Sequence, residues 1–288
     1  MQDSADSTGE HLKHSISTGV VCVASSPKYV LMLQPFLDSI VLHSPSTPIV
    51  VYTKFPLNST LPRSVINKVH PELVGHWDDK IRILESAPFD KIIYMDVDMI
   101  VLDTFVKDIE LGLEGSDLVI RSGMCFNIEW EKRVAPRHLS QFNTGIFGIR
   151  KEVVESFVQA FWRFRNVPEV NEAWIGDQIP FRAAALTTGL RVQELNSDFN
   201  FMGGFQYVVD RVRIVHFAGS HYLMNSPKRL KICQDLQVAT PGTTHFAWKP
   251  IYQHKHFKPL NVFYLVSVDI LLQVKFYIYR VYKRITKS

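Results

Sequence analysis

The chain of 288 residues contains 21% charged and 46% hydrophobic residues, and its formal net charge is +4 at pH 7. This composition argues against an intrinsically disordered protein, because there are enough apolar residues to form a sizeable core. The positive excess is small, and Lys and Arg form a tract only near the C-terminus, which argues against a nucleic-acid-binding protein.

The first residues of the chain predict a lead-in followed by a βαβ unit. Residues 1–17 are polar and lack an apolar run, so we expect them to be disordered and neither a signal peptide nor an anchor. Residues 19–24 form a continuous apolar run, typical of a strand buried on both faces of a parallel sheet. A helix is expected over residues 29–42 and a strand over residues 49–52, which together predict the start of a doubly wound sheet.

Strand and helix patterns continue to alternate along the rest of the chain. A strand over residues 91–95 runs directly into Asp96 and Asp98, and residues 99–102 are apolar again. Further expected elements are a short helix at 79–84, strands at 145–149 and 212–216, and helices at 152–164 and 175–185. Because no Pro/Gly/Ser-rich linker interrupts this alternation, we expect one α/β domain over residues 18–258.

The three cysteines, Cys22, Cys125 and Cys233, are far apart in the sequence and odd in number. They therefore indicate neither a disulfide framework nor a zinc site. We interpret them as buried thiols of a protein in a reducing compartment.

Asp96 and Asp98 are the strongest candidates for a functional site. In open α/β sheets ligands bind at the carboxyl ends of strands, and two acids at positions i and i+2 of an extended chain point to the same side. Their oxygen atoms suit Mg²⁺ or Mn²⁺. Two acids between apolar runs are costly unless a metal or hydrogen-bond donors compensate them. The alternative is that they begin a solvated turn.

Residues 88–102, PFDKIIYMDVDMIVL, resemble the metal-binding strand of glycosyltransferase family 8, which contains glycogenin and bacterial lipo-oligosaccharide galactosyltransferases. Three more segments resemble motifs of that family in the expected order: FNTGIF at 142–147, GDQ at 176–178 and HFAG at 216–219. The resemblance covers residues 19–222. It implies a GT-A fold, which is a Rossmann-like, mainly parallel sheet flanked by helices.

By this resemblance, His216 completes the metal site of Asp96 and Asp98, and its imidazole makes the site a mixed nitrogen and oxygen one. Gly219 would let the backbone approach the donor's phosphates closely. The ordinary alternative for His216 is a core or surface histidine whose hydrogen bonds are satisfied within the protein.

The resemblance also assigns catalytic positions to Asp177, Gln178 and Asn143. Asp177 would lie near the anomeric carbon of the donor and orient its sugar. Asp177 has an alternative role as the cap of the following helix, and Asn143 has one as the cap of a turn.

The remaining expected contacts are with the nucleotide part of the donor. Tyr29 would stack on the uracil of a UDP-sugar, although ordinary helix packing is an alternative for this residue. Lys80 would lie near the donor. The expected donor-binding residues are Ala24, Ser26, Tyr29, Lys80, Asp96, Val97 and Gly219.

The chain departs from the family at Tyr222, where the family has a lysine that neutralises the diphosphate. A tyrosine hydroxyl can donate a hydrogen bond but carries no charge. Either Lys228 or Arg229 folds back toward the diphosphate, or the metal carries more of the charge compensation.

The C-terminal segment is expected to contact a membrane. Residues 260–282 are almost continuously apolar, and Lys283, Arg284 and Lys287 follow them. A bilayer span would bury Asp269 and Lys275 at a cost of about 2.5–3.5 kcal/mol each. We therefore expect residues 259–288 to form a basic amphipathic helix on an anionic membrane surface. The alternative is a helix that packs on the domain or in a homodimer.

These features predict a metal-dependent hexosyltransferase that uses Mn²⁺ or Mg²⁺, located in the cytoplasm and peripherally attached to a membrane. Its partners would be a nucleotide-sugar donor and a glycan or glycolipid acceptor, and no nucleic acid. Retention of configuration follows from the resemblance alone. The alternatives are an inverting GT-A enzyme and a non-catalytic sugar-nucleotide-binding or membrane scaffold protein. A nucleotidyltransferase or phosphatase lacks support, because the chain has no glycine-rich phosphate loop.

Overall fold

The computed structural model describes residues 16–57, 61–122, 142–168, 176–202, 206–209, 211–218, 224, 226–237, 244–247 and 255–257. The expectations for residues 1–15, Cys125, Gly219, Tyr222 and the segment 259–288 lie outside these ranges. Within the described ranges, no helix combines the length and the apolar character needed to cross a bilayer.

A seven-stranded sheet with the order β3-β2-β1-β4-β7-β6-β8 forms the centre of the structure. Four parallel strands make up one half of it: β1 (Ile16–Ala24), β2 (Ile49–Thr53), β3 (Val65–Val69) and β4 (Phe89–Met95). β7 (Phe142–Arg150) is antiparallel to β4 and β6 (Leu118–Ser122), and β8 (Val192–Leu195) is parallel to β6. The expected α/β, mainly parallel sheet is therefore confirmed.

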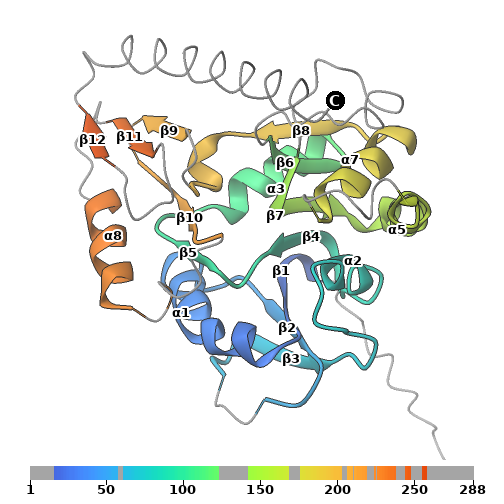
Figure 1. Ribbon diagram of the computed structural model, residues 1–288, viewed down its shortest axis with the longest axis horizontal. Coiled ribbons are helices and arrows are strands. Elements are labelled where there is room, and N and C mark those ends of the chain that lie inside the picture. Colours follow the sequence, from blue (N-terminus) through green and yellow to red (C-terminus); the bar gives the residue numbers. More distant parts are fainter. Residues whose placement is uncertain are drawn as a thin grey trace, which may run out of the picture.

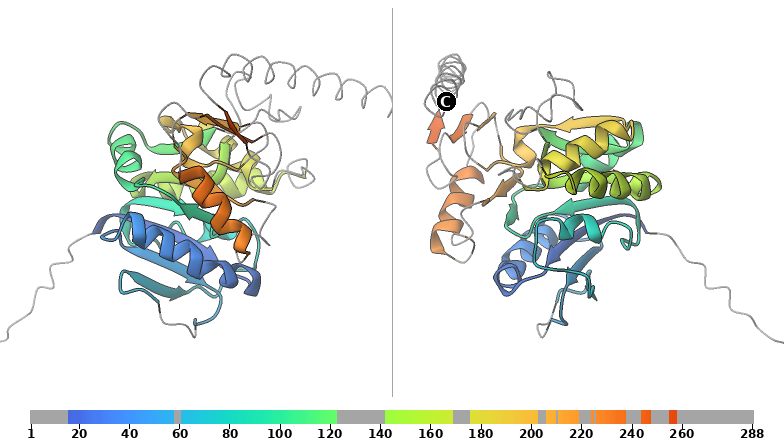
Figure 2. Two further views of the ribbon diagram at one scale, coloured as in Figure 1. Left: turned by 90° about the vertical axis from the view of Figure 1, so that its left-hand side faces the viewer. Right: turned by 45° about the vertical axis from the view of Figure 1, so that its right-hand side comes forward.

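Helices cover both faces of this sheet (Figures 1 and 2). Val20 and Cys22 of β1 belong to a core that includes residues of α1 (Pro27–His43) and α3 (Val106–Gly115). The alternate residues Val21 and Val23 belong to a second core with α2 (Asp79–Arg82), α5 (Lys151–Arg165) and α7 (Gln178–Thr187). A strand that is apolar on both faces is buried between two layers, as its sequence predicts.

Two short strands outside the sheet position the candidate site. β5 (Met99–Val101) follows β4 after a turn and pairs antiparallel with β10 (Ile214–His216), so that Met99 lies opposite His216. The remaining elements are a 3-10 helix, η1 (Ser197–Phe199), then α8 (Pro227–Gln237) and a small sheet of β9 (Gln206–Val209), β11 (Thr244–Ala247) and β12 (Lys255–Phe257). The β5–β10 pair therefore joins residues far apart in the sequence.

Several boundaries differ from those expected. β1 begins at Ile16, within the expected lead-in, and β7 begins at Phe142 rather than at residue 145. α7 begins at Gln178, three residues later than expected. The strands β3, β6 and β8 and the helix α3 were not expected from the sequence.

The expected burial of the thiols is confirmed for the two cysteines that the structure describes. Cys22 and Cys233 are buried free thiols. Burial raises the pKa of Cys22 well above its usual range and that of Cys233 to about 12. Both thiols are therefore uncharged and unreactive at neutral pH.

Candidate metal centre

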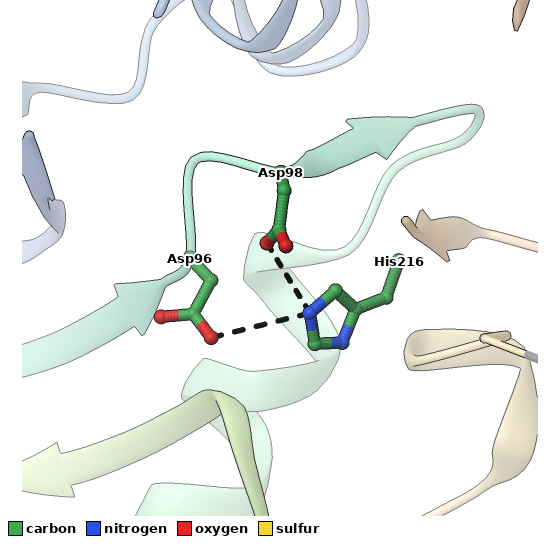
Figure 3. A group of neighbouring side chains, drawn as sticks. All are labelled: Asp96, Asp98 and His216. Carbon is green, nitrogen blue, oxygen red and sulfur yellow. Dashed lines mark ion pairs between the residues drawn. The ribbon is translucent and has the colours of Figure 1, made fainter. Parts of the chain in front are cut away.

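Asp96, Asp98 and His216 converge at the carboxyl end of β4 (Figure 3). Asp96 is the first residue after β4, Asp98 precedes β5, and His216 ends β10. One ligand atom from each residue lies within 4.8 Å of the others. The Nε2 atom of His216 is 3.2 Å from Oδ1 of Asp98 and 4.0 Å from Oδ2 of Asp96. We call these three residues the metal-ligand group.

Backbone hydrogen bonds fix the chain on both sides of the metal-ligand group. The amide of Phe217 donates to the carbonyl of Asp98 at 2.8 Å, and the amide of Asp96 donates to the carbonyl of Gly145 at 2.8 Å. Gly145 is needed here because a Cβ atom at that position would lie 2.5 Å from Cε1 of His216. The site therefore depends on β7 as well as on the strands that carry the ligands.

The chemistry of these side chains fits a divalent cation. Two carboxylates and one imidazole form a mixed oxygen and nitrogen set, which suits Mn²⁺ and is also compatible with Mg²⁺. Asp98 and His216 are 6% and 5% exposed, whereas the side chain of Asp96 retains 26% exposure. Solvent or a ligand would thus reach a cation at this site most easily beside Asp96.

The two carboxylates make a proton on His216 more favourable. Burial alone would lower the pKa of His216, but the charge and hydrogen bond of Asp98, followed by the charge of Asp96, raise it above the ordinary 6.5. The loss of water around Asp96 raises the pKa of that carboxyl group; Lys80 acts against this shift and Asp98 adds to it. A cation would therefore displace a proton from His216 on binding.

Lys80, Thr144 and Asp177 form a second cluster beside the metal-ligand group, which we call the lysine group. The ammonium of Lys80 lies 3.2 Å from Oδ1 of Asp96, 3.2 Å from Oδ2 of Asp177 and 3.2 Å from the carbonyl of Thr144. The hydroxyl of Thr144 donates to Oδ2 of Asp177 at 2.5 Å. Burial alone would lower the pKa of Lys80, but Asp177 and Asp96 outweigh it and raise the pKa. Lys80 therefore stays charged.

Asp177 does not cap the helix that follows it. It occupies the N-cap position of α7, but its carboxylate makes no capping hydrogen bond and faces Lys80 and Thr144 instead. Gln178 is the first residue of α7 and is half-buried. Gly176 has φ +59, and its backbone approaches Trp77 so closely that a Cβ atom would lie 2.4 Å from the indole ring.

Asn143 lies within the strand β7, and its side chain makes the local hydrogen bond to the backbone two residues on that the cap alternative describes. Its Oδ1 atom accepts hydrogen bonds from the amide of Gly145 at 3.0 Å and from Nδ2 of Asn200 at 2.7 Å. Its Nδ2 atom donates to the sulfur of Met202 at 3.1 Å. The structure thus links Asn143 to His216 through Asn200, which contacts Nδ1 of the imidazole.

The expected nucleoside loop lies at the start of α1. Ala24 is the buried last residue of β1, and Ser26 is the N-cap residue of α1. Tyr29, in the first turn, is half-buried, and burial, then Asp96 and Asp98, raise its pKa. Tyr29 therefore lies close enough to the metal-ligand group to sense its charge.

The remaining candidates from the sequence are Val97 and the basic residues of α2 and α8. Val97 is buried in the turn between Asp96 and Asp98. In α8, Lys228 is exposed and Arg229 donates to the carbonyl of Met224. Arg82 stacks on Trp162 and pairs with Asp79, so among the basic residues of α2 it is Lys80 that reaches the site.

Three side chains of the site were missed by sequence reasoning: Tyr94, Thr144 and Asn200. Tyr94 donates to Oδ1 of Asp96 at 2.7 Å, and Asn200 lies against His216. Tyr94 and Thr144 belong to segments already singled out, so a search for hydroxyl groups near the acids would have found them. Asn200 had a weaker signal, which is a polar residue between two phenylalanines.

Comparison of the chain with protein-family models gives no match, and comparison with curated proteins gives none.

Proposed function

We propose that this protein is a metal-dependent glycosyltransferase of the family 8, GT-A type. It would move a hexose from a nucleotide diphosphate sugar, a UDP-sugar by resemblance, to a hydroxyl of a glycan or glycolipid. The observation that carries the proposal is the convergence of Asp96, Asp98 and His216 within 4.8 Å at the carboxyl end of a central strand. This convergence argues most strongly against the alternative of a solvated turn, because Asp98 is buried.

The metal-ligand group would hold Mn²⁺ or Mg²⁺, which supplies charge compensation for the diphosphate that leaves with the nucleotide. Asp96 and Asp98 provide the negative charge that attracts the cation, and His216 provides a neutral nitrogen ligand once it has lost its proton. Tyr29, whose pKa is raised in part by these carboxylates, would pack against the nucleoside. These residues would bind and orient the donor.

The lysine group is suited to the sugar side of the donor. Both described contacts of the Asp177 carboxylate, with Lys80 and Thr144, use Oδ2, and we assign Oδ1 to accept a hydrogen bond from a sugar hydroxyl. A carboxylate already paired with an ammonium and a hydroxyl is a weak nucleophile, so we assign Asp177 to orientation of the sugar. Lys80 is held charged, and because its three hydrogens face Asp96, Asp177 and Thr144, it would act on the donor through its charge and by holding Asp177 in place.

The experiment is turnover of a panel of nucleotide sugars by the full-length protein, followed by mass spectrometry with Mn²⁺, with Mg²⁺ and with a chelator. We expect release of the nucleotide from at least one donor, faster with an acceptor present and abolished by the chelator. NMR of the product's anomeric proton then separates retention from inversion. Tight donor binding without turnover across acceptors would support the non-catalytic alternative, and no binding of any donor would refute the proposal.

We also propose that residues 259–288 attach the enzyme to a membrane surface, which is supported by the apolar and basic sequence of that segment. Flotation with anionic vesicles is expected for the full chain at low salt, and less of it at high salt. Equal flotation of a variant truncated after residue 258 would rule out this attachment. Salt-insensitive self-association would favour the homodimer instead.

A further inference from the structure

Asn200 is a buried side chain next to His216 for which no role has been assigned so far. It follows η1 and is fully buried, at 0% exposure. The next residue, Phe201, lies beside β10: its amide donates to the carbonyl of Ile214 at 2.9 Å, and its carbonyl accepts from the amide of His216 at 3.0 Å. These two backbone hydrogen bonds fix Asn200 beside the imidazole.

A chain of hydrogen bonds determines how the amide of Asn200 is oriented. It starts at the backbone amide of Gly145, which can only donate and which lies 3.0 Å from Oδ1 of Asn143. That oxygen lies 2.7 Å from the side chain of Asn200, so Asn200 presents its Nδ2 donor there. Reversing either amide would place two donors or two acceptors against each other. Oδ1 of Asn200 must therefore face His216.

This orientation determines which nitrogen of His216 carries the hydrogen. Nδ1 of His216 is 2.9 Å from Oδ1 of Asn200, and an amide oxygen can only accept. Nδ1 must therefore be the protonated nitrogen in the neutral ring. Nε2, which lies 3.2 Å from Oδ1 of Asp98, is then the nitrogen at which either a proton or a cation can bind between the ring and the carboxylates.

We propose that Asn200 is a positioning residue for the metal centre, which holds His216 with the hydrogen on Nδ1 so that Nε2 is the nitrogen offered to a divalent cation. The proposal rests on the metal site of the proposed function. Ligating histidines commonly donate their second nitrogen to an acceptor that fixes the ring, and loss of such a partner weakens metal binding. The chain of hydrogen bonds thus runs from the β7 backbone through Asn143 and Asn200 to His216.

The test is binding of Mn²⁺ alone, without donor, measured by calorimetry and by electron paramagnetic resonance of free Mn²⁺. Asn200→Leu removes the acceptor at similar volume and should raise the Mn²⁺ Kd about 10–100-fold. Asn200→Asp keeps an oxygen that accepts from Nδ1 but loses the donor to Asn143. We expect Asn200→Asp to bind Mn²⁺ more tightly than Asn200→Leu while being no more stable to heat. A purely structural role would make metal affinity follow stability.

Ser116→Ala is the matched control. The hydroxyl of Ser116 is also buried and donates to the carbonyl of Gly112 at 2.7 Å at the end of α3, so its loss should lower stability without changing Mn²⁺ affinity. An Mn²⁺ Kd for Asn200→Leu within twofold of wild type would overturn the proposal. If Asn200→Leu binds Mn²⁺ as wild type does but Asp98→Asn does not bind it, the proposal for Asn200 fails while the metal site remains supported. Absence of Mn²⁺ binding to wild type would refute both.

Nitrogen NMR of the wild-type protein keeps the proposal testable should the leucine variant fail to fold. With ring ¹⁵N-labelled histidine and Mg²⁺ present, His216 should show a hydrogen on Nδ1 and a metal-bound Nε2. A hydrogen on Nε2 in the metal-bound protein would contradict the assignment.

Discussion

The metal-ligand group and the lysine group lie side by side, joined by the contact between Lys80 and Asp96, but they balance charge in different ways. In the lysine group a buried ammonium lies 3.2 Å from the carboxylate of Asp177, and the hydroxyl of Thr144 completes the cluster. In the metal-ligand group two carboxylates face one imidazole, and their negative charge raises the pKa of that imidazole above its ordinary value.

This difference indicates which half of the site is complete without a ligand. The lysine group is held by its own ion pair and hydrogen bonds, as expected of a preformed binding surface. The metal-ligand group keeps an excess of negative charge that a divalent cation would neutralise. Substitutions in the first half should therefore act mainly on stability, and those in the second mainly on metal binding.

The largest expected effect on stability is that of Lys80→Met. Methionine fills a similar volume but leaves the carboxylates of Asp96 and Asp177 without their cation, and such a loss from a buried pair costs about 3–5 kcal/mol. Thermal unfolding of the metal-free protein should show a large drop in Tm. A change of less than one degree would contradict the view that this ion pair holds the lysine group together.

Asp98→Asn should weaken metal binding strongly and change stability little, which is the reverse of what is expected for Lys80→Met. It removes a ligand charge, while the backbone hydrogen bond from Phe217 to the carbonyl of residue 98 remains. We expect the Mn²⁺ Kd to rise more than about 100-fold, beyond the effect of losing an indirect partner, with turnover lost in parallel. The Tm without metal should change far less than in Lys80→Met. Unchanged Mn²⁺ affinity would show that Asp98 is not a ligand.

The layered fold could be predicted from the sequence because its central strands are buried on both faces. The runs that became β1, β2 and β4 are continuous and apolar, and the structure confirms all three. The edge strands β3 and β8 were missed, because only Val65 is buried in β3 and no residue is buried in β8. Strands of this kind are defined by their hydrogen-bonded neighbour and carry little hydrophobic pattern of their own.

The site was predicted where residues of one segment act together and was missed where contacts join distant segments. Asp96 and Asp98 were predicted to face one side of an extended chain; the structure does bring them together, but through the turn that follows β4. His216 was singled out by resemblance, and its contact with Asp98 is formed by the β5–β10 pair. Asn200 reaches His216 through the contact of Phe201 with β10, which no local pattern encodes.

The pH dependence of Mn²⁺ binding should distinguish the two groups further. Because the pKa of His216 is raised above 6.5, a proton on Nε2 competes with the cation, and affinity should fall as the pH drops through that raised pKa, by up to about tenfold per pH unit. The stability that His216 gives the metal-free protein has the opposite sign: it is fully present below pH 6.5 and lost as pH rises through the raised pKa. Calorimetry in a pH series checks the affinity, and a pH-independent Kd would exclude His216 as a ligand.

The smallest expected effect is that of Tyr94→Phe, which tests the contact between the two halves of the site at Asp96. The ring of Tyr94 stacks on Phe147 at 5.1 Å between centroids, so phenylalanine should keep the packing and lose only the hydroxyl that donates to Asp96. A hydrogen bond of this kind contributes about 0.5–1.5 kcal/mol, so we expect the Mn²⁺ Kd to rise roughly 3–10-fold. Tyr52→Phe is the matched control, because the hydroxyl of Tyr52 donates to the carbonyl of Ser86 at 2.8 Å on another strand of the same sheet. Both variants should lose similar stability, but only Tyr94→Phe should bind Mn²⁺ more weakly. An equal loss of affinity in both variants would mean that the hydroxyl of Tyr94 stabilises the sheet without orienting Asp96.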